Sequence, residues 1–224
     1  MEIKIASENS LMLYFGKKID KDIATMVKKA YLCLKSLNLE GIFEIIPSYT
    51  SIFISYDIFK YDFNSISKLL KQSIDLEHTD DLEQNIITID VYYGTEVGLD
   101  LEDMSRKTDL SIDEIIKLHS QKLYDIYAIG FLPGFAYLAS VDEKIAMARL
   151  ATPRKQIPKG SVGIADTQTA VYPQNSPGGW NIIGRTAMQL FDKNLEKLSP
   201  LSMGDKVKFN PISKEEYLFQ GGEV

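Results

Sequence analysis

The hydrophobic pattern of the first third of the chain switches between the period of a strand and that of a helix. Residues 2–6 and 11–15 alternate apolar and polar side chains around Glu8-Asn9-Ser10, which predicts a hairpin or bent strand. Residues 20–37 then repeat apolar side chains at the spacing of one helix face. The chain is therefore expected to begin with two strand segments and an amphipathic helix.

The following segments continue this alternation. Residues 42–46 and 51–56 flank Pro47-Ser48-Tyr49-Thr50 and predict a hairpin, and residues 62–74 predict a second amphipathic helix. Residues 86–93 are rich in Ile, Val and Tyr, which is typical of a strand. The order βαββα, with one further strand available, predicts a small ferredoxin-like α/β domain at the N-terminus.

A polar and acidic segment, residues 75–85, separates the second helix from that last strand. It contains His78, which we expect to be exposed to solvent. A length of 224 residues suits one large domain or two small ones. We therefore predict two domains, residues 1–85 and residues 86–224, joined by this linker.

The second domain is expected to begin with helices and to continue with short strands. Residues 99–107 predict a short helix, and Ser111 with Glu114 has the spacing of a capping box, so a second helix should begin near Ile112 and end near His119. A partly cationic His119 would complement the dipole at this helix C-terminus. The short strands expected beyond it are residues 124–129, 161–165, 170–172, 181–185, 187–191 and 206–209. Such strands, separated by Gly and Pro turns, predict a sandwich or a barrel within an α+β protein.

Charge and hydropathy narrow the class of protein. The formal net charge of −6 argues against binding nucleic acid or an anionic membrane through a general basic surface. No run approaches the roughly 18 apolar residues of a transmembrane helix, and residues 1–5 lack the layout of a signal peptide. We therefore expect a cytoplasmic protein with no nucleic-acid or membrane partner.

The residue types of several common active sites are scarce. Cys33 is the only cysteine, which excludes an intramolecular disulfide and a thiolate zinc site. With only His78 and His119 in the chain, we expect no metal centre. The phosphate-binding loop, the nucleophile elbow, the HExxH motif and the dinucleotide fingerprint are also missing. A self-contained catalyst of these classes is not expected.

Glycine and proline alternate with aromatic residues in one region. Residues 130–138, 153–162 and 176–180 carry this composition, and Trp180, the only tryptophan, follows Pro177-Gly178-Gly179. Gly tolerates positive φ and close approach, whereas Pro fixes φ, so such a surface is shaped rather than flexible. It could form an aromatic wall beside a ligand or partner. Taken one motif at a time, tight turns capped by core aromatics are the better interpretation.

A local exception to the acidic composition lies in the same region. Residues 149–161 contain Arg149, Arg154, Lys155 and Lys159 and no acidic residue. Arg can hold a carboxylate or phosphate with two parallel hydrogen bonds, so this stretch is a candidate anion-binding segment. A solvated basic loop explains it equally well. His119 leaves a similar choice between a general base and a structural residue.

Taken in order, these motifs carry a specific resemblance. They are Leu118-His119-Ser120, Tyr124, Gly130-Phe131-x-Pro133-Gly134-Phe135-x-Tyr137-Leu138, Pro153-Arg154, Pro158-x-Gly160-Ser161-Val162, Gln168-Thr169, Tyr172-Pro173, Pro177-Gly178-Gly179-Trp180 and Ile183-Gly184-Arg185-Thr186. Together they resemble the family of 5-oxoprolinase B subunits, also described as the KipI-type kinase-inhibitor or allophanate hydrolase subunit 1 family. Lys159 departs from the pattern, where a small residue is common, and adds a charge.

The resemblance implies a small N-terminal α/β domain followed by a cyclophilin-like β-barrel. It also implies a non-autonomous B subunit that works with the A and C subunits of 5-oxoprolinase in the cleavage of 5-oxo-L-proline to L-glutamate, with ATP and Mg used by the complex. One alternative is a KipI-like protein that inhibits a sensor histidine kinase. Another is a component of an allophanate or urea-amidolyase-type hydrolase. Intrinsic prolyl isomerase activity is a weaker alternative.

Residues 119–186 supply the expected site. We take His119 as the candidate for proton transfer or orientation. The candidates for binding substrate or nucleotide are Arg154, Lys159, Ser161, Gln168, Arg185 and Thr186. The candidates for a groove or a partner interface are Phe131, Pro133, Gly134, Phe135, Pro177, Gly178, Gly179 and Trp180.

Overall fold

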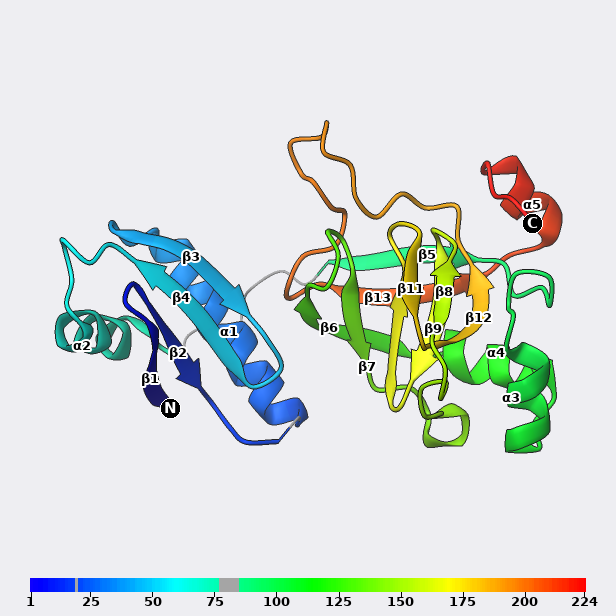
Figure 1. The fold of residues 1–224 in the computed structure, drawn as a ribbon, viewed down its shortest axis with the longest axis horizontal. Helices are drawn as coiled ribbons and strands as arrows, with labels where there is room; N and C mark the ends of the chain where they lie inside the picture. Colours follow the sequence, from blue (N-terminus) through cyan, green and yellow to red (C-terminus); the bar gives the residue numbers. More distant parts are fainter. Residues whose placement is uncertain (19, 77–84) are drawn as a thin grey trace. The chain divides into compact units, whose positions relative to one another are not determined.

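A computed structural model describes residues 1–18, 20–76 and 85–224 of the chain. The chain divides into two compact units, Met1–Glu83 and Gln84–Val224, and each is described by itself (Figure 1). His78 lies outside the described residues. The described helices include none whose length and apolar character would let it cross a membrane.

The first unit is an antiparallel sheet with two helices. Its strands stand in the order β1-β2-β4-β3, with each neighbouring pair antiparallel. These elements are β1 (Glu2–Ser7), β2 (Ser10–Tyr14), α1 (Lys21–Leu37), β3 (Ile42–Pro47), β4 (Ser51–Tyr56) and α2 (Phe63–Ser73). Both predicted hairpins and both predicted helices are confirmed.

Local hydrogen bonds define where these helices begin. The Asp20 carboxylate accepts from the Asp22 amide at 2.8 Å, and the Asp62 carboxylate accepts from the Ser65 amide at 2.7 Å. The apolar face of α1 packs against β3 and β4. The fully buried core residues of this unit are Leu11, Leu13, Val27, Ala30, Leu34, Ile52, Ile54, Ile66 and Leu70.

The strand expected to complete a ferredoxin-like unit does not join this sheet, so that prediction was wrong. Instead, β5 (Ile86–Val91) pairs in parallel with β13 (Lys206–Pro211) in the second unit. The reason is burial, since Ile89 and Val91 are completely buried in the second unit. In the first sheet, β1 takes the outer position beside β2.

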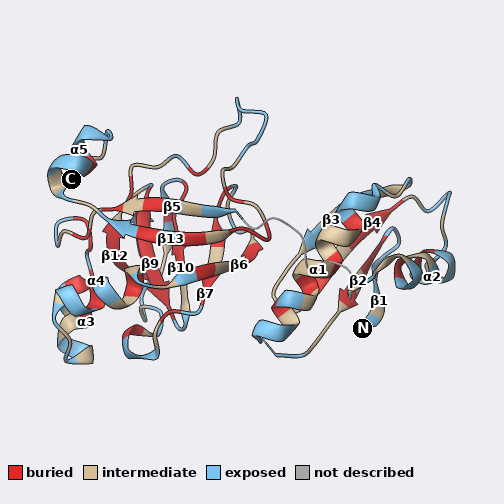
Figure 2. Cartoon of the chain, turned by 180° about the vertical axis from the view of Figure 1, so that it is seen from behind, coloured by how far each residue is buried: buried red, intermediate tan, exposed pale blue. Residues whose placement is uncertain are grey.

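The second unit is a barrel-like sheet of seven strands in the order β12-β9-β10-β7-β6-β13-β5 (Figure 1). The remaining strands are β6 (Leu123–Ile129), β7 (Ala136–Ala139), β9 (Ser161–Ala165), β10 (Gln168–Val171) and β12 (Asn181–Arg185). Just beyond β5, Tyr92 exchanges two backbone hydrogen bonds with Arg185 at the end of β12, both at 2.9 Å. The two edges of the sheet are thereby joined, and the barrel is nearly closed. Figure 2 shows buried residues along these strands.

Helices and one short ribbon complete this unit. They are α3 (Leu101–Thr108), α4 (Ile112–Ser120), the single-turn η1 (Glu143–Ile145), α5 (Lys214–Phe219) and the ribbon of β8 (Arg154–Ile157) with β11 (Ser176–Gly178). The predicted capping box is confirmed: the Glu114 amide donates to Ser111 Oγ at 3.3 Å, and the Ser111 amide donates to Glu114 Oε2 at 2.8 Å.

Some local patterns were misread in the second unit. Residues 187–191, expected as a strand, are irregular. Conversely, β7, β8 and β11 were not expected, because the glycines and prolines around them suggested turns alone. The strands predicted at residues 124–129, 161–165, 181–185 and 206–209 are confirmed within a residue or two at their ends.

Closure of the barrel makes Gly184 a sensitive position. A Cβ atom on Gly184 would lie 2.8 Å from the Tyr92 carbonyl oxygen and 2.9 Å from Val91 Cγ1. We expect Gly184→Ala to lower the free energy of unfolding by about 1–3 kcal/mol, since the neighbouring backbone must shift. Urea unfolding followed by circular dichroism measures this loss.

Gly130→Ala is the matched control, because a Cβ atom there meets nothing within 4 Å. It should leave the free energy of unfolding within about 0.5 kcal/mol of the parent value. Equal unfolding midpoints for the two variants would contradict the importance of close packing where Tyr92 meets the end of β12.

Candidate anion-binding site

The residues expected to form one site lie in different places in the second unit. His119 is in the interior, Arg154 is held in an ion pair, and most of the aromatic residues form a core cluster. Lys159, Arg185 and Thr186 line a common cavity. This cavity is the candidate functional site.

His119 is completely buried and both of its ring nitrogens are hydrogen-bonded. Nδ1 lies 2.8 Å from the Tyr93 hydroxyl and Nε2 lies 2.9 Å from Thr169 Oγ1. Because Thr169 donates its own proton to the Gly163 carbonyl at 3.0 Å, it accepts from Nε2–H, and Tyr93 donates to Nδ1. The network is fully satisfied only when His119 is neutral.

Burial lowers the pKa of His119 to about 3. The expectation of a partly cationic His119 at a helix end was therefore wrong, because the last turn of α4 faces the barrel interior. The ring centroid lies 4.5 Å from that of Phe209 on β13. His119 thus connects α4 to the sheet rather than facing solvent, where a ligand would meet it.

Arg154 has an intramolecular partner that the sequence did not reveal. Its Nη1 and Nη2 atoms donate to the Asp100 carboxylate at 3.0 and 2.7 Å, and that carboxylate also accepts from the Ile182 amide at 2.6 Å. Asp100 stands at the N-terminus of α3 and is 5% exposed. The two terminal nitrogens of Arg154 are therefore both engaged by Asp100, so its predicted role in binding substrate or nucleotide stays a prediction.

Most of the aromatic residues pack against one another instead of facing a groove. Phe135 meets Trp180 and Tyr172 edge to face, with ring centroids 5.7 and 5.4 Å apart. Trp180 is only 4% exposed, and Gly134 is buried against the Leu190 carbonyl. This corrects the expectation of an aromatic wall that includes Phe135 and Trp180. The tight turns hold a core.

The exposed members of the predicted interface are Phe131, Pro133 and Pro177, while Gly178 and Gly179 are half-buried. Phe131 is 62% exposed and has a φ angle of 73°. An aromatic residue in the left-handed region is strained by roughly 1–2 kcal/mol. The Phe131 ring meets Phe135 edge to face, with centroids 5.4 Å apart, but most of its surface stays exposed.

The candidate cavity has a volume of ≈ 270 Å³ and lies between the end of β12 and the segment that follows α5. Arg185 is the last residue of β12, and Thr186 follows it. Lys159 enters from the turn before β9, where its amide donates to Asn175 Oδ1 at 2.7 Å. That turn needs Gly160, whose φ is +80° and whose missing side chain leaves room for the Thr186 carbonyl.

Arg185 is only partly satisfied by its surroundings. Its Nη1 donates to the Glu223 carbonyl at 3.1 Å, and the Tyr217 hydroxyl donates to the same oxygen at 3.0 Å. Its Nε is buried, and none of the described residues accepts from it. Ser161, directly opposite Arg185 in the β9–β12 pairing, also has a buried hydroxyl with no partner among the described residues. A buried donor or hydroxyl without a partner calls for a specific explanation, such as a bound water or ion.

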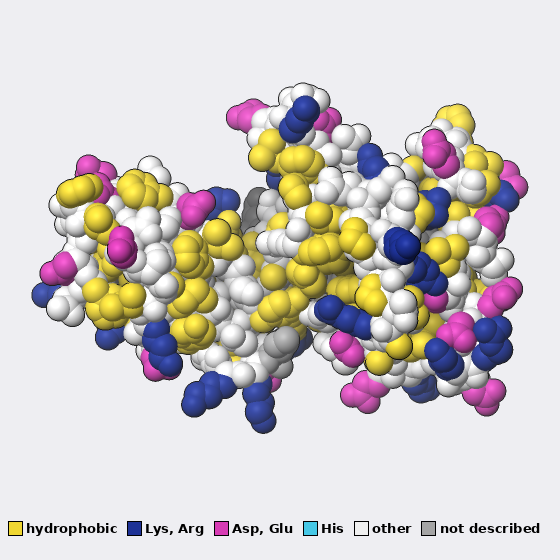
Figure 3. Space-filling view, viewed as in Figure 1, with side chains coloured by type: hydrophobic (Ala, Val, Ile, Leu, Met, Phe, Trp, Pro, Cys, Tyr) yellow, Lys and Arg dark blue, Asp and Glu magenta, His cyan; other side chains and the backbone are white. Residues whose placement is uncertain are grey.

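The charge of the cavity lining is positive. Lys159 is exposed, no described residue accepts from its ammonium group, and Glu223 is the only acid in the lining. Figure 3 shows Lys and Arg side chains among apolar ones on one face of this unit. Gln168, at the start of β10, is half-buried and does not line the cavity. Sequence reasoning missed Asn175, Tyr217 and Glu223, since only the fold brings them to Arg185.

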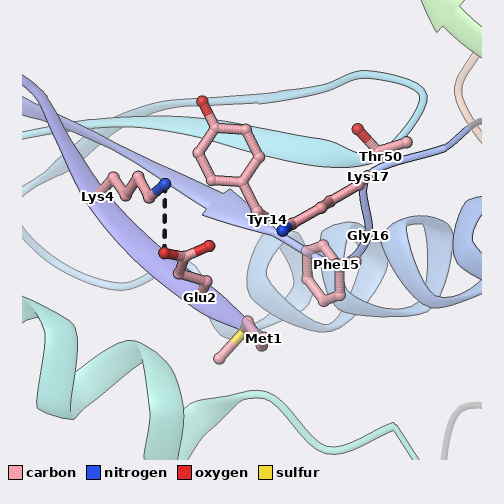
Figure 4. A pocket seen from close by; sticks show the side chains of 8 residues that line it. All are labelled: Met1, Glu2, Lys4, Tyr14, Phe15, Gly16, Lys17 and Thr50. Carbon is pink, nitrogen blue, oxygen red and sulfur yellow. Dashed lines mark ion pairs between the residues drawn. The ribbon is translucent and has the colours of Figure 1, made fainter.

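A larger cavity of ≈ 620 Å³ lies in the first unit (Figure 4). There Lys4 pairs with Glu2 at 3.2 Å and lies 5.6 Å from the ring centroid of Tyr14. Lys17 also lines it. None of the residues expected from the sequence lies there, and its charged groups are partly paired. Over the whole described part of the chain, no three His, Cys, Asp or Glu side chains are grouped so as to hold a metal ion.

Comparison with known proteins places the chain in a family. The family model for the carboxyltransferase domain, subdomain C and D, matches residues 1–201. The 5-oxoprolinase B subunit from Bacillus subtilis is 35% identical over 228 aligned positions, which cover 96% of this chain and 95% of that protein. This chain belongs to the family of 5-oxoprolinase B subunits. The family member from Haemophilus influenzae is 39% identical over 76% of this chain and 79% of its own length.

Solved structures share the fold of this family member. TTHA0988 superposes with a TM-score of 0.81 at 28% identity over 91% of this chain, which spans only 40% of the length of TTHA0988. PH0987 from Pyrococcus horikoshii is 38% identical over 96% of this chain and 100% of its own, with a TM-score of 0.59. The K. lactis urea amidolyase, at 16% identity and a TM-score of 0.73, matches 97% of this chain and 15% of its own and shows the fold alone.

The neutral state of His119 makes stability depend on pH. The pKa of His119 in the folded protein, about 3, lies below the ordinary value of 6.5, so the unfolded chain binds the proton first as pH falls. As pH falls from 6.5 to about 3, protonation of this group in the unfolded chain should lower the free energy of unfolding by up to about 1.4 kcal/mol per pH unit. His119→Gln removes this contribution and should flatten the dependence, as measured by urea unfolding at a series of pH values.

His78→Gln is the control for histidine titration in general, and it should keep the slope of the parent protein. The same slope in His119→Gln and in the parent would rule out a neutral, buried His119 as its origin.

Proposed function

We propose that this chain is the non-autonomous B subunit of an ATP-dependent 5-oxoprolinase that converts 5-oxo-L-proline to L-glutamate together with the A and C subunits of that enzyme. Relatives named as 5-oxoprolinase B subunits support this proposal, because one of them matches both units of the chain over nearly its full length. The name of those relatives itself indicates a protein that works in an assembly.

The cavity lining supports a non-autonomous role, because it contains hydrogen-bond donors but lacks the candidate for proton transfer. Lys159, Arg185 and Thr186 supply hydrogen-bond donors, but neither His119 nor Arg154 reaches that lining. Opening a lactam requires delivery of water and protonation of the leaving nitrogen, which are tasks for a general base and a general acid. In this proposal the chain contributes binding groups, and its partner proteins contribute the groups that move protons.

We also propose that ATP and Mg are used by the assembled complex and are not bound by this chain alone. The sequence has no phosphate-binding loop, and the cavity of ≈ 270 Å³ is below the range of about 300–1,000 Å³ usual for larger ligands. These residues do not fit a nucleotide with its metal. No step of the reaction is therefore assigned to ATP on this chain.

Reconstitution tests the proposed function directly. The chain is purified with the A and C subunits from the same organism, and glutamate release from 5-oxo-L-proline is measured with and without ATP. We expect turnover only when all three proteins and ATP are present. Unchanged turnover without this chain, or no turnover with all three, would reject it. Inhibition of a sensor histidine kinase by the chain in the absence of any turnover would favour the KipI-like alternative.

Phe131 is the residue that we propose for contact with a partner protein in the complex. Its exposure of 62% and its strained backbone are features that burial against a partner would explain. Phe131→Gly should weaken assembly with the partner, measured by analytical ultracentrifugation, by about tenfold or more, since an exposed aromatic anchor is typically worth at least about 1–2 kcal/mol. The melting temperature of the isolated chain should stay equal or rise, because Gly relieves the strain.

Phe59→Gly provides the matched control, since Phe59 is 97% exposed and belongs to the first unit. It should leave assembly unchanged. If both variants assemble like the parent, Phe131 is not part of the interface.

A further inference from the structure

Arg185 and Lys159 line the same cavity, and each has a hydrogen-bond donor with no acceptor among the described residues. We propose that this cavity binds the carboxylate group of a small organic acid, with the Arg185 guanidinium and the Lys159 ammonium group as its donors. Several features of the cavity carry the proposal: the orientation of the guanidinium, the free ammonium group, the net charge and the volume.

The orientation of Arg185 is set by the protein before a ligand binds. Nη1 is committed to the Glu223 carbonyl, and the backbone of Arg185 is fixed by its two hydrogen bonds to Tyr92. The remaining edge of the guanidinium carries Nε, which is buried without an acceptor from the described residues. A carboxylate in the cavity that Arg185 lines can accept charge-assisted hydrogen bonds from the part of the guanidinium that faces it.

Lys159 adds the second positive charge. Its backbone is held by Asn175, while its ammonium group has no acceptor within the described part of the chain. Lys159 and Arg185 together with Glu223 give the lining a net charge of +1. That balance suits a singly charged carboxylate better than a phosphate group, which carries about −1.5 to −2 near pH 7.

The volume limits the size of the acid. A cavity of ≈ 270 Å³ accommodates a small ring or short chain beside its carboxylate. Tyr217 lines one wall, and its ring stacks on that of Tyr92 with centroids 5.6 Å apart, which gives the site a rigid apolar side. The identification of the acid as 5-oxoproline, rather than another small carboxylate, rests on the proposed function.

Binding to the full chain tests this site without any partner. Isothermal titration calorimetry is run with 5-oxo-L-proline, L-glutamate, inorganic phosphate and ATP as separate probes. We expect 5-oxo-L-proline to bind and Arg185→Gln to weaken it about 10- to 100-fold, the loss typical of a charge-assisted hydrogen bond. Lys159→Gln should weaken it about 3- to 10-fold, because Lys159 is exposed.

Matched variants separate binding from folding. Lys155→Gln removes an exposed charge from a residue that does not line the cavity, and should bind like the parent. Arg185→Gln also loses the bond to Glu223, so its melting temperature is measured, and Lys159→Gln serves as the variant that leaves every described hydrogen bond in place. Parent-like affinity in both cavity variants would overturn the proposal, as would binding of phosphate or ATP but of no carboxylic acid.

Turnover in the reconstituted complex distinguishes this inference from the proposed function. If Arg185→Gln raises the KM for 5-oxo-L-proline with kcat less affected, both stand. If the parent complex turns over but Arg185→Gln has an unchanged KM, the inference fails and the proposed function survives. If no complex is active but the chain binds small carboxylic acids through Arg185, the inference survives and the proposed function fails.

Discussion

The paired backbone hydrogen bonds between Tyr92 and Arg185 are the contact on which the second unit depends. They join the strand edge beyond β5 to the end of β12, so that the sheet has no long open edge. Closure explains why Gly184 cannot carry a side chain without displacing its neighbours. It also fixes the backbone of Arg185, and therefore the place where that cation can act.

Closure of the barrel and burial of side chains separate the residues with structural roles from those that can still bind a ligand. His119 resembles a catalytic base in sequence, but inside the barrel its neutral ring connects Tyr93 to Thr169. Arg154 resembles an anion ligand, but Asp100 neutralises it. Arg185 lies at the rim of the same barrel and keeps a donor without an acceptor from the described residues. Position in the fold, rather than residue type, gives these groups different chemistry.

Much of the first unit could be predicted because its signals are local. The alternation in residues 11–15 and 51–56 and the helical spacing in residues 20–37 each involve neighbours within a few positions, and the structure forms the predicted elements there. The error concerned β5, whose strand character was clear but whose partner, β13, lies more than a hundred residues away. Pairing over such a separation leaves no mark on the local pattern of either strand.

The sequence by itself determined the family, four of the helices, the Ser111 capping box, most strands and the presence of Arg185 in a Gly-Arg-Thr motif, whereas α5 was not expected. Only the tertiary structure decided that Trp180 is a core residue, that Asp100 holds Arg154, and that Glu223 meets Arg185. The physical reason is that burial and ion pairing are properties of a closed barrel. They arise between residues separated by dozens of positions, whereas propensity and periodicity report only on near neighbours.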